Sequence, residues 1–459
     1  MPRLSVSRRR GRRWPWLATV AFALTLAACG GGATATIAPH GPTPRAQGAA
    51  SAVATAPPVG TSASPTRAAT PVAAVTATGR TTGTSAPGGA IPAAGAPRPV
   101  TLAVPKGQGQ TQATEQRTLT LPEGFQIDIF AAGLGRARFM AWSPEGALVI
   151  SEQGTTDGKV SVLTDPDKDG TADQRTVFAQ GLRNPHGLAF RDGYLYVAEE
   201  TRVVRFRWQG GGAASGSPEV LIASLPTGGH ASRTIGFGPD GKLYLTIGSS
   251  CNVCNESDAR RAAIWQYNAD GSGGRLYARG LRNAVGFVWR PGSDEIWATN
   301  NGRDGLGDNI PPETVNLVRD GNDFGWPYCH NGVLRDQQFG AGGSCERVTK
   351  PAIEMQAHSA PLGLAFYTGS AFPADYSGDL FVAFHGSWNR SVPTGYKVVR
   401  ARFQDGKPTG QVEDFVTGWL PDNGRSSWGR PVDLIVGPNG DLYLSDDALG
   451  VVYRISYGH

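Results

Sequence analysis

One pattern of apolar and turn residues recurs six times between residues 118 and 459. In each copy a Gly- or Asp-containing turn precedes a short aromatic-aliphatic segment, and another short apolar segment comes before the turn. The copies are GALVIS (146–151), GYLYVA (193–198), GKLYLT (241–246), DEIWAT (294–299), GDLFVA (378–383) and GDLYLS (440–445). Two short strands joined by a tight turn, with no amphipathic helical stretch between copies, are typical of antiparallel sheets.

The spacing of the copies favours an all-β fold, a six-bladed β-propeller over residues 118–459. Successive copies are 47, 48, 53, 84 and 62 residues apart, and the first three intervals suit a four-stranded blade with its loops. The fourth interval predicts an insertion. A β-sandwich is the alternative, but it does not explain six copies of one hairpin. Pairing of residues 119–130 with 451–456 is expected to close the ring, which removes exposed strand edges.

The N-terminus predicts export. Residues 3–13 contain six arginines and no acid, and residues 14–28 are an apolar run too short to span a bilayer comfortably. Residues 1–28 are therefore expected to be a signal peptide. Cys29 directly follows Leu26-Ala27-Ala28, which matches a bacterial lipobox and predicts a lipid anchor on this cysteine. An ordinary cleaved signal is the alternative, and the arginine run also suits twin-arginine export.

Residues 29–117 predict a disordered tether. The segment is mostly Ala, Thr, Pro, Gly and Ser, and such a composition buries too little apolar surface to offset chain entropy. The whole chain has a net charge of +5. Residues 1–117 alone contribute +11, so residues 118–459 have a net charge of −6. A mildly acidic folded part argues against nucleic acid as a partner.

Four cysteines follow Cys29, and an even number in an exported protein favours disulfides. The expected pairs are Cys251 with Cys254 and Cys329 with Cys345, each of which closes a local loop. A zinc site made of all four is the main alternative. A thioredoxin-like role of the CxxC sequence is disfavoured because no βαβ pattern surrounds it.

Polar residues gather at one end of the predicted strands. In a propeller, the residues just before the first strand and just after the second strand of each blade surround the same mouth of the central channel. Those before are Arg138, His186, His230, Arg282, Asn283, His358 and Arg430; those after are Glu152, Glu199, Ser249, Asn300, Asn301, His385 and Asp446. A mouth rich in Arg, His and Asn suits an anionic, oxygen-rich ligand. A single histidine is more often a structural residue than a catalyst, and a single arginine is usually a surface charge, so the prediction rests on their convergence at one mouth.

Several segments resemble the PQQ-dependent glucose and sorbosone dehydrogenases (PQQ is pyrroloquinoline quinone). They are GGHASRTIGFGPDGKLYLTIGSS (228–250), GLRNAVGF (280–287), TNNG (299–302), DGNDFGWPYC (320–329) and HGSWNR (385–390), and the resemblance covers nearly all of residues 118–459. It implies PQQ and Ca²⁺ in the central pocket, oxidation of an aldose or related, sorbosone-like sugar to its lactone or acid, and an external quinone or cytochrome as electron acceptor.

The resemblance also implies roles for single residues. His230 resembles the general base that removes the sugar's hydroxyl proton, a step suited to histidine. The residues that resemble cofactor contacts are Arg282, Asn283, Asn301 and Arg430. Gly302 and Arg303 follow at positions whose backbone carbonyls bind Ca²⁺ in that family. The family's cofactor-binding lysine has no clear counterpart, and His385 or Arg390 is expected to replace it.

The chain departs from the glucose enzymes at several of these positions. Ser249 and Gly229 stand where those enzymes have aspartates, and Val432 stands where they have a second arginine. These departures are closer to the sorbosone-type enzymes. Two functions of other classes stay open: a propeller that binds carbohydrate or protein without catalysis, and a lactonase-type hydrolase, which would need a metal held by carboxylates that the basic mouth does not offer.

A separate segment, DPDKDGTAD (165–173), predicts a second calcium site. Its alternating carboxylates are Asp165, Asp167, Asp169 and Asp173, with a glycine at the turn, and they resemble the oxygen ligands of a calcium loop. No glutamate stands at the twelfth position, and a plain acidic turn is the alternative.

Overall fold

The computed structural model of the chain describes residues 95–102, 117–421 and 424–458. The predicted signal peptide, Cys29 and most of the predicted tether lie outside these residues. Within the described ranges the regular structure is β-strands and two single-turn 3₁₀ helices, Gly340–Gly342 and Ala374–Tyr376. None of the helices described there has the length and hydropathy needed to cross a membrane.

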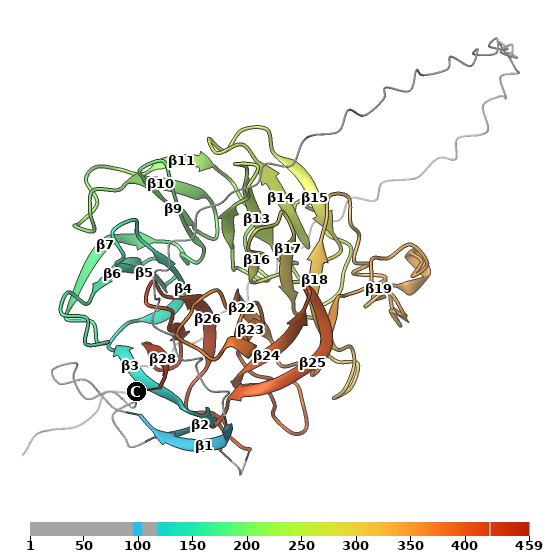
Figure 1. Cartoon of the computed structure of the whole chain (residues 1–459). Helices are drawn as coiled ribbons and strands as arrows, with labels where there is room; N and C mark the ends of the chain where they lie inside the picture. The colour runs from blue at the N-terminus through green and yellow to red at the C-terminus, as the bar shows by residue number, and fades with distance from the viewer. Residues whose placement is uncertain (1–94, 103–116, 422–423, 459) are drawn as a thin grey trace, which may run out of the picture. The chain divides into compact units, whose positions relative to one another are not determined.

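Six four-stranded antiparallel sheets form the blades of a propeller, which confirms the predicted fold (Figure 1). The first three blades contain β4 (Arg136–Trp142), β5 (Leu148–Gln153), β6 (Gly158–Thr164) and β7 (Gln174–Leu182); β8 (Leu188–Arg191), β9 (Tyr194–Ala198), β10 (Val203–Arg207) and β11 (Glu219–Ile222); and β12 (Ile235–Phe237), β13 (Leu243–Ile247), β14 (Ala263–Tyr267) and β15 (Arg275–Arg279). The six repeated segments of the sequence form the second strands of the blades.

The last three blades continue the pattern. They contain β16 (Phe287–Trp289), β17 (Ile296–Asn300), β18 (Glu313–Val318) and β21 (Ile353–Met355); β22 (Pro361–Phe366), β23 (Leu380–Phe384), β24 (Lys397–Gln404) and β25 (Lys407–Val416); and β26 (Pro431–Val436), β27 (Leu442–Asp446), β28 (Val451–Tyr457) and β3 (Phe125–Ala131). Strand β3 pairs antiparallel with β28, with Ile127 opposite Ile455. The predicted ring closure is therefore confirmed.

One segment of the predicted tether forms a strand instead. Strand β1 (Gly95–Thr101) pairs antiparallel with β2 (Thr118–Glu123). Val100 and Leu102 are buried with Leu119 and Leu121 of the core. The composition of the segment, rich in Ala and Pro, predicted disorder. Burial of Val100 and Leu102 nevertheless attaches the segment to β2.

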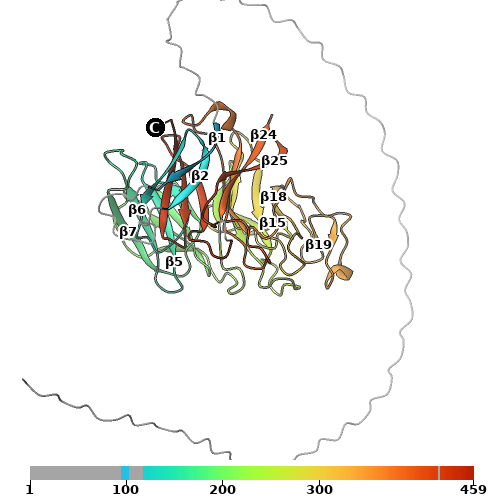
Figure 2. The ribbon, with the colours of Figure 1, turned by 90° about the horizontal axis from the view of Figure 1, so that it is seen from below.

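The fourth blade carries the predicted insertion. Residues 319–352 lie between β18 and β21 and include the hairpin of β19 (Cys329–His330) and β20 (Leu334–Arg335), which projects from the rim of the ring (Figure 2). A disulfide joins Cys329 to Cys345 in this insertion, and another joins Cys251 to Cys254. Both predicted pairs are confirmed, and the alternative zinc site of four thiolates is wrong.

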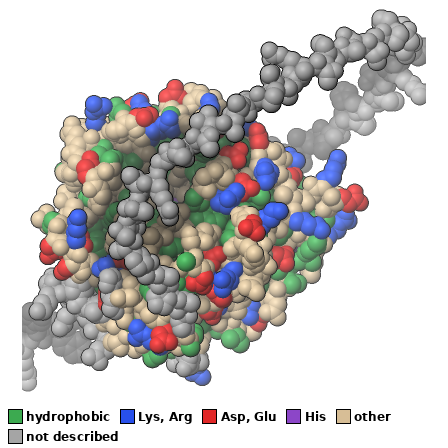
Figure 3. Space-filling model, in the orientation of Figure 1, with side chains coloured by type: hydrophobic (Ala, Val, Ile, Leu, Met, Phe, Trp, Pro, Cys, Tyr) green, Lys and Arg blue, Asp and Glu red, His purple; other side chains and the backbone are tan. Residues whose placement is uncertain are grey.

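The surface in the orientation of Figure 1 carries acidic and basic side chains intermixed (Figure 3). This agrees with the small net charge of −6 that residues 118–459 carry. An intermixed surface does not concentrate one sign of charge as a phosphate-binding face does.

Buried hydrogen bonds from the second strand of one blade, or from the residue just before its first strand, reach the first strand of the next blade or the residues just before it. A hydroxyl of one blade donates to a backbone carbonyl of the next at four junctions: Ser151 to His186, Thr234 to Val285, Thr299 to Leu362 and Ser445 to Arg138. The chains also approach closely, since a Cβ on Gly286 would lie 2.2 Å from the Leu362 carbonyl oxygen. At the axis the apolar side chains of four blades pack together, namely Phe139, Val285, Leu362 and Val432.

The ring-closing hydroxyl gives a stability prediction. Ser445 is fully buried, and its Oγ donates to the Arg138 carbonyl at 2.6 Å and accepts from the Asp433 amide at 3.1 Å. Ser445→Ala leaves both groups without this partner, which costs about 1–3 kcal/mol. Urea unfolding should show that loss, whereas the exposed control Ser215→Ala should match the wild type. An unchanged midpoint for Ser445→Ala would contradict the role given to these bonds.

Candidate active site

The predicted site residues lie just before the first strands or just after the second strands of the blades, and backbone hydrogen bonds bring them together in pairs. The His230 amide donates to the Ser249 carbonyl, the Ser249 amide to the Arg282 carbonyl, and the Asn301 amide to the Asn283 carbonyl. Residues before first strands and residues after second strands therefore meet at one end of the ring, as the repeat pattern predicts.

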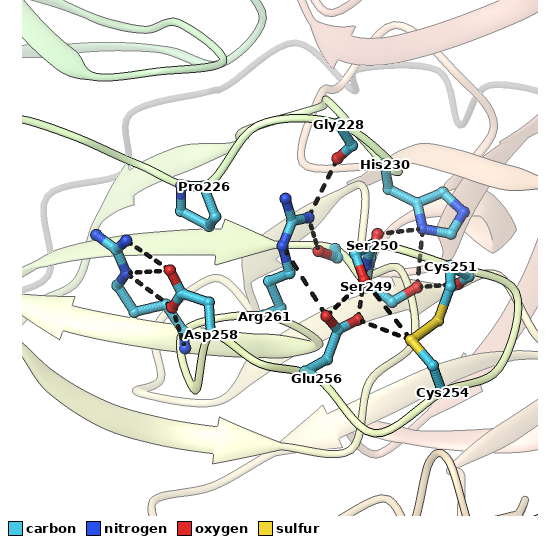
Figure 4. A network of polar contacts seen from close by, with 12 residues as sticks. Pro226, Gly228, His230, Ser249, Ser250, Cys251, Cys254, Glu256, Asp258 and Arg261 are labelled. Atoms are coloured by element: carbon cyan, nitrogen blue, oxygen red, sulfur yellow. Dashed lines mark hydrogen bonds and ion pairs between the residues drawn. A yellow bond between two sulfur atoms is a disulfide. The ribbon is translucent and has the colours of Figure 1, made fainter. Parts of the chain in front are cut away.

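His230 is held through one ring nitrogen. Its Nδ1 lies 3.0 Å from both the carbonyl oxygen and the Oγ of Ser249 (Figure 4). A carbonyl only accepts, so we assign the proton to Nδ1, which leaves Nε2 unprotonated. Burial, and then the charge of Arg282, lower the pKa of His230 to about 4. The imidazole is therefore neutral at pH 7, and its Nε2, which has no hydrogen-bond partner in the described part of the chain, can accept a proton.

Arg282 is a buried cation with fixed partners. Its Nη2 forms an ion pair with Asp304 at 2.7 Å, and its Nε donates to the Asn252 carbonyl at 2.9 Å. Only 6% of its side chain is exposed, and burial lowers its pKa, although the Asp304 carboxylate opposes that shift. A guanidinium held in this way directs positive charge toward one place in the site.

The turn after β17 presents backbone carbonyls. The Gly302 amide donates to the Glu313 carboxyl at 2.7 Å, and burial raises the pKa of Glu313 to about 7. The Arg303 guanidinium is engaged by Asp336, which also bonds His330 at 2.8 Å. No hydrogen bond from the described residues ends on the carbonyls of Gly302 or Arg303. These two oxygens could therefore serve a hard cation.

A second group of charged residues surrounds Asp447. One carboxylate oxygen lies 2.8 Å from Nε2 of His385, and the other lies 2.7 Å from Nη1 of Arg138. Arg138 in turn lies 3.3 Å from Nε2 of His186. Burial lowers the pKa of His385 to about 4, although Asp447 opposes that shift. Despite burial, hydrogen bonding and the charges of His385 and Arg138 hold the pKa of Asp447 well below its usual range.

Two neighbouring side chains of the segment after β23, those of Asn389 and Arg390, have different partners. Asn389 donates to Asp304 at 2.8 Å and lies 3.2 Å from Nδ1 of His358. The guanidinium of Arg390 instead binds backbone carbonyls, those of Asp308, Ala357 and Val392. Asn389, and not Arg390, is therefore the residue of this segment that bonds to the partner of Arg282.

Three acids of the predicted mouth form ion pairs or hydrogen bonds with neighbouring residues of the fold. Glu152 pairs with Arg175 at 2.7 Å, Glu199 pairs with Arg202 at 2.6 Å, and Asp446 accepts from the Arg430 amide at 2.9 Å. Arginines of the fold thus neutralise the two glutamates, and a backbone amide engages Asp446, so these acids are already engaged within the fold.

The acidic turn brings three of its four aspartates together. Oxygens of Asp165, Asp167 and Asp173 lie within 4.8 Å of one another, whereas Asp169 is not part of that group. Asp169 accepts instead from the Thr171 amide at 2.8 Å. One oxygen of Asp165 is buried and has no hydrogen-bond partner among the described residues.

Sequence reasoning missed several partners of the site residues. Asn252, Asp304, Asn389 and Asp447 contact the predicted site residues, but none stands at a repeat position. Only Asp447 could have been found from the sequence, because it directly follows the predicted mouth residue Asp446 after the last repeat. The other three meet the site through loops of different blades, which no spacing in one repeat reveals.

Comparisons with known proteins agree with this architecture. The sequence profile of the family described as TrAA12-like matches residues 119–458. An uncharacterized protein of Borreliella burgdorferi is 32% identical over 76% of this chain and 93% of its own length. A pyrroloquinoline quinone-dependent pyranose dehydrogenase of Coprinopsis cinerea is 24% identical to this chain. The alignment covers 73% of this chain and 54% of that protein. The calcium structure of a Trichoderma reesei enzyme of carbohydrate-active family AA12 superposes with a TM-score of 0.66 at 20% identity, covering 77% of this chain and 99% of that one.

Proposed function

The chain belongs to the TrAA12-like family, and from that membership we propose that it is a PQQ- and calcium-dependent dehydrogenase that oxidises an aldose or a related, sorbosone-like sugar to its lactone or acid. The observation that carries the proposal is His230, a half-buried neutral imidazole whose Nε2 has no hydrogen-bond partner among the described residues, beside the buried cation Arg282. Electrons then leave to an external quinone or cytochrome.

The residues present fit such a cofactor. Within the described residues the Arg430 guanidinium bonds only to the carbonyl oxygens of His385 and Gly386, so no acid neutralises it. Arg138 Nε and Asn389 Oδ1 are buried without a hydrogen-bond partner in the described chain. An unneutralised cation and unused polar atoms at one mouth suit a ligand with several carboxylates and carbonyls.

Each residue then has a role. Arg430, Arg282, Asn283, Asn301 and His385 would hold PQQ, Gly302 and Arg303 would hold Ca²⁺ through their carbonyls, and Arg390 stays a prediction. The chemistry that these groups supply when bound is hydride acceptance by a polarised quinone. His230 Nε2 accepts the proton of the sugar hydroxyl, and Ser249 keeps the ring in the tautomer that can do so. Arg282 stabilises negative charge that develops nearby.

The general base gives the main functional prediction. His230→Ala should lose sugar oxidation by about a hundredfold or more while it still binds PQQ, because general-base catalysis contributes about 10²–10⁴-fold. Arg282→Ala should weaken both cofactor binding and turnover. Dye-coupled oxidation assays beside a PQQ titration measure both effects.

The pH dependence of turnover tests the same base. Only the unprotonated form of His230 accepts a proton, and its pKa is about 4. The wild type should therefore keep its activity as pH falls to about 5 and lose it as pH falls through the pKa. An active His230→Ala variant with wild-type turnover would show that another residue is the base.

We also propose that the acidic turn at residues 165–173 binds a structural calcium ion. Calcium should raise the melting temperature of the wild type because it binds only the folded state. The double variant Asp165→Asn/Asp167→Asn should lose part of that response and keep sugar oxidation. Asp192→Asn, whose side chain is 76% exposed, is the control. An unchanged calcium response in the double variant would identify a plain acidic turn.

Residues 1–29 support one more proposal, that the protein is exported and anchored through a lipid on Cys29. Cys29→Ser should then release the protein from the membrane fraction or block its processing, since only the thiol receives the lipid. Fractionation and mass measurement of the N-terminus check this. Normal processing with membrane retention would refute the lipid anchor and leave export standing.

A further inference from the structure

The loop that follows β13 is closed and braced beside the site. The disulfide between Cys251 and Cys254 closes it, and the amide and Oγ of Ser250 donate to Glu256 at 2.6 and 2.7 Å (Figure 4). The Oγ of Ser249, which also contacts His230, donates to the Cys251 carbonyl at 2.6 Å. The loop therefore has little freedom at the point where it meets the proposed base.

Asn252 lies between the two cysteines and engages Arg282 twice. Its carbonyl accepts from Arg282 Nε at 2.9 Å, and its Oδ1 accepts from Arg282 Nη2 at 3.1 Å. The same carbonyl accepts from the Trp326 indole at 3.2 Å. One residue thus occupies two donors of the guanidinium and determines the direction in which the rest of it points.

Asn252 also holds the counter-ion of Arg282. Its Oδ1 accepts from the Asp304 amide at 2.8 Å, and its Nδ2 donates to the Asp304 carbonyl at 2.9 Å. The Asp304 carboxylate pairs with Arg282 at 2.7 Å. The Asn252 side chain therefore bridges the cation and the backbone of its acid, which come from loops on either side of β16 and β17.

We infer that Asn252 is a positioning residue for Arg282 and that the Cys251–Cys254 disulfide holds it in place. The inference rests on the proposed function, since it assigns importance to the direction of the Arg282 guanidinium. Within the described ranges the hydrogen bonds of Asn252 go to Arg282, Asp304 and Trp326 and none goes to His230, Gly302 or Arg303, so Asn252 acts through Arg282. Its side chain is exposed enough to be replaced without opening a cavity in the core.

Three variants test the inference: Asn252→Ala, the double variant Cys251→Ser/Cys254→Ser, and the control Asn255→Ala. Asn255 lies on the same stretch, and its Oδ1 accepts from the Tyr328 hydroxyl at 2.8 Å. Loss of a hydrogen bond to a charged group predicts about a tenfold or larger fall in PQQ affinity and in kcat for Asn252→Ala. KM for the sugar and the melting temperature of the apoprotein should stay near wild type, and Asn255→Ala should match the wild type throughout.

A double-mutant cycle separates positioning from a general structural effect. Because Asn252 acts through Arg282, Asn252→Ala should add nothing in the Arg282→Ala background. The disulfide variant should reproduce the Asn252→Ala pattern. Additive losses, or an Asn252→Ala variant that behaves like Asn255→Ala, would overturn the inference.

A readout without cofactor keeps this inference separate from the proposed function. In a crystal structure of the Asn252→Ala apoprotein, Nη2 of Arg282 should move from its place beside Asp304, although the main-chain carbonyl of residue 252 still accepts from Nε, whereas the Asn255→Ala apoprotein should keep it. An unmoved Arg282 overturns the positioning role even if the wild type binds PQQ. A wild type that binds no PQQ overturns the proposed function, and the Arg282 position still decides the role of Asn252.

Discussion

Neighbouring blades are joined near the channel by hydrogen bonds from buried hydroxyls to backbone carbonyls, and the position of the channel mouth follows from them. Ser151 and Ser445 donate to the carbonyls of His186 and Arg138, two residues of the mouth itself. A bond of this kind fixes the backbone from which a functional side chain projects. The ring and the site therefore depend on the same contacts, and neither can shift without the other.

The second constraint is electrostatic. Buried cations at one mouth need acids, and the fold supplies them from loops and not from the repeats: Asp304 for Arg282, and Asp447 for Arg138. Removing either partner would leave a buried charge uncompensated, which is costly. The same burial and positive charge lower the pKa of His230 to about 4, so the environment that would hold an anionic cofactor also keeps the proposed base unprotonated.

Much of the fold could be predicted because it is periodic. Repeated strand pairs predicted the blades, and the apolar ends of the repeat region predicted the pairing of β3 with β28. Local spacing predicted both disulfides. Strand β1 could not be predicted because its segment is rich in Ala and Pro. Only two apolar residues there, Val100 and Leu102, become buried and attach the segment to the fold. Composition averages over such exceptions.

The site could be predicted less completely. Residues such as His230 and Arg282 stand at repeat ends, and the pattern therefore brought them together. Their partners Asn252 and Asp304 lie in loops whose length and course no repeat describes, and only the folded chain joins them. Arg390, which the family resemblance suggested as a replacement for a cofactor-binding lysine, has a guanidinium that binds backbone carbonyls, and its role stays a prediction.

The absorption spectrum of the purified protein, reconstituted with PQQ and Ca²⁺ and then mixed with sugars, shows whether this propeller is a PQQ-dependent sugar dehydrogenase. We expect a stoichiometric spectral change on PQQ binding and a second change, to reduced cofactor, when an oxidisable aldose or sorbosone-like sugar is added. Absence of PQQ binding, or bound PQQ that no sugar reduces, would contradict this expectation and favour a propeller that binds ligands without catalysis.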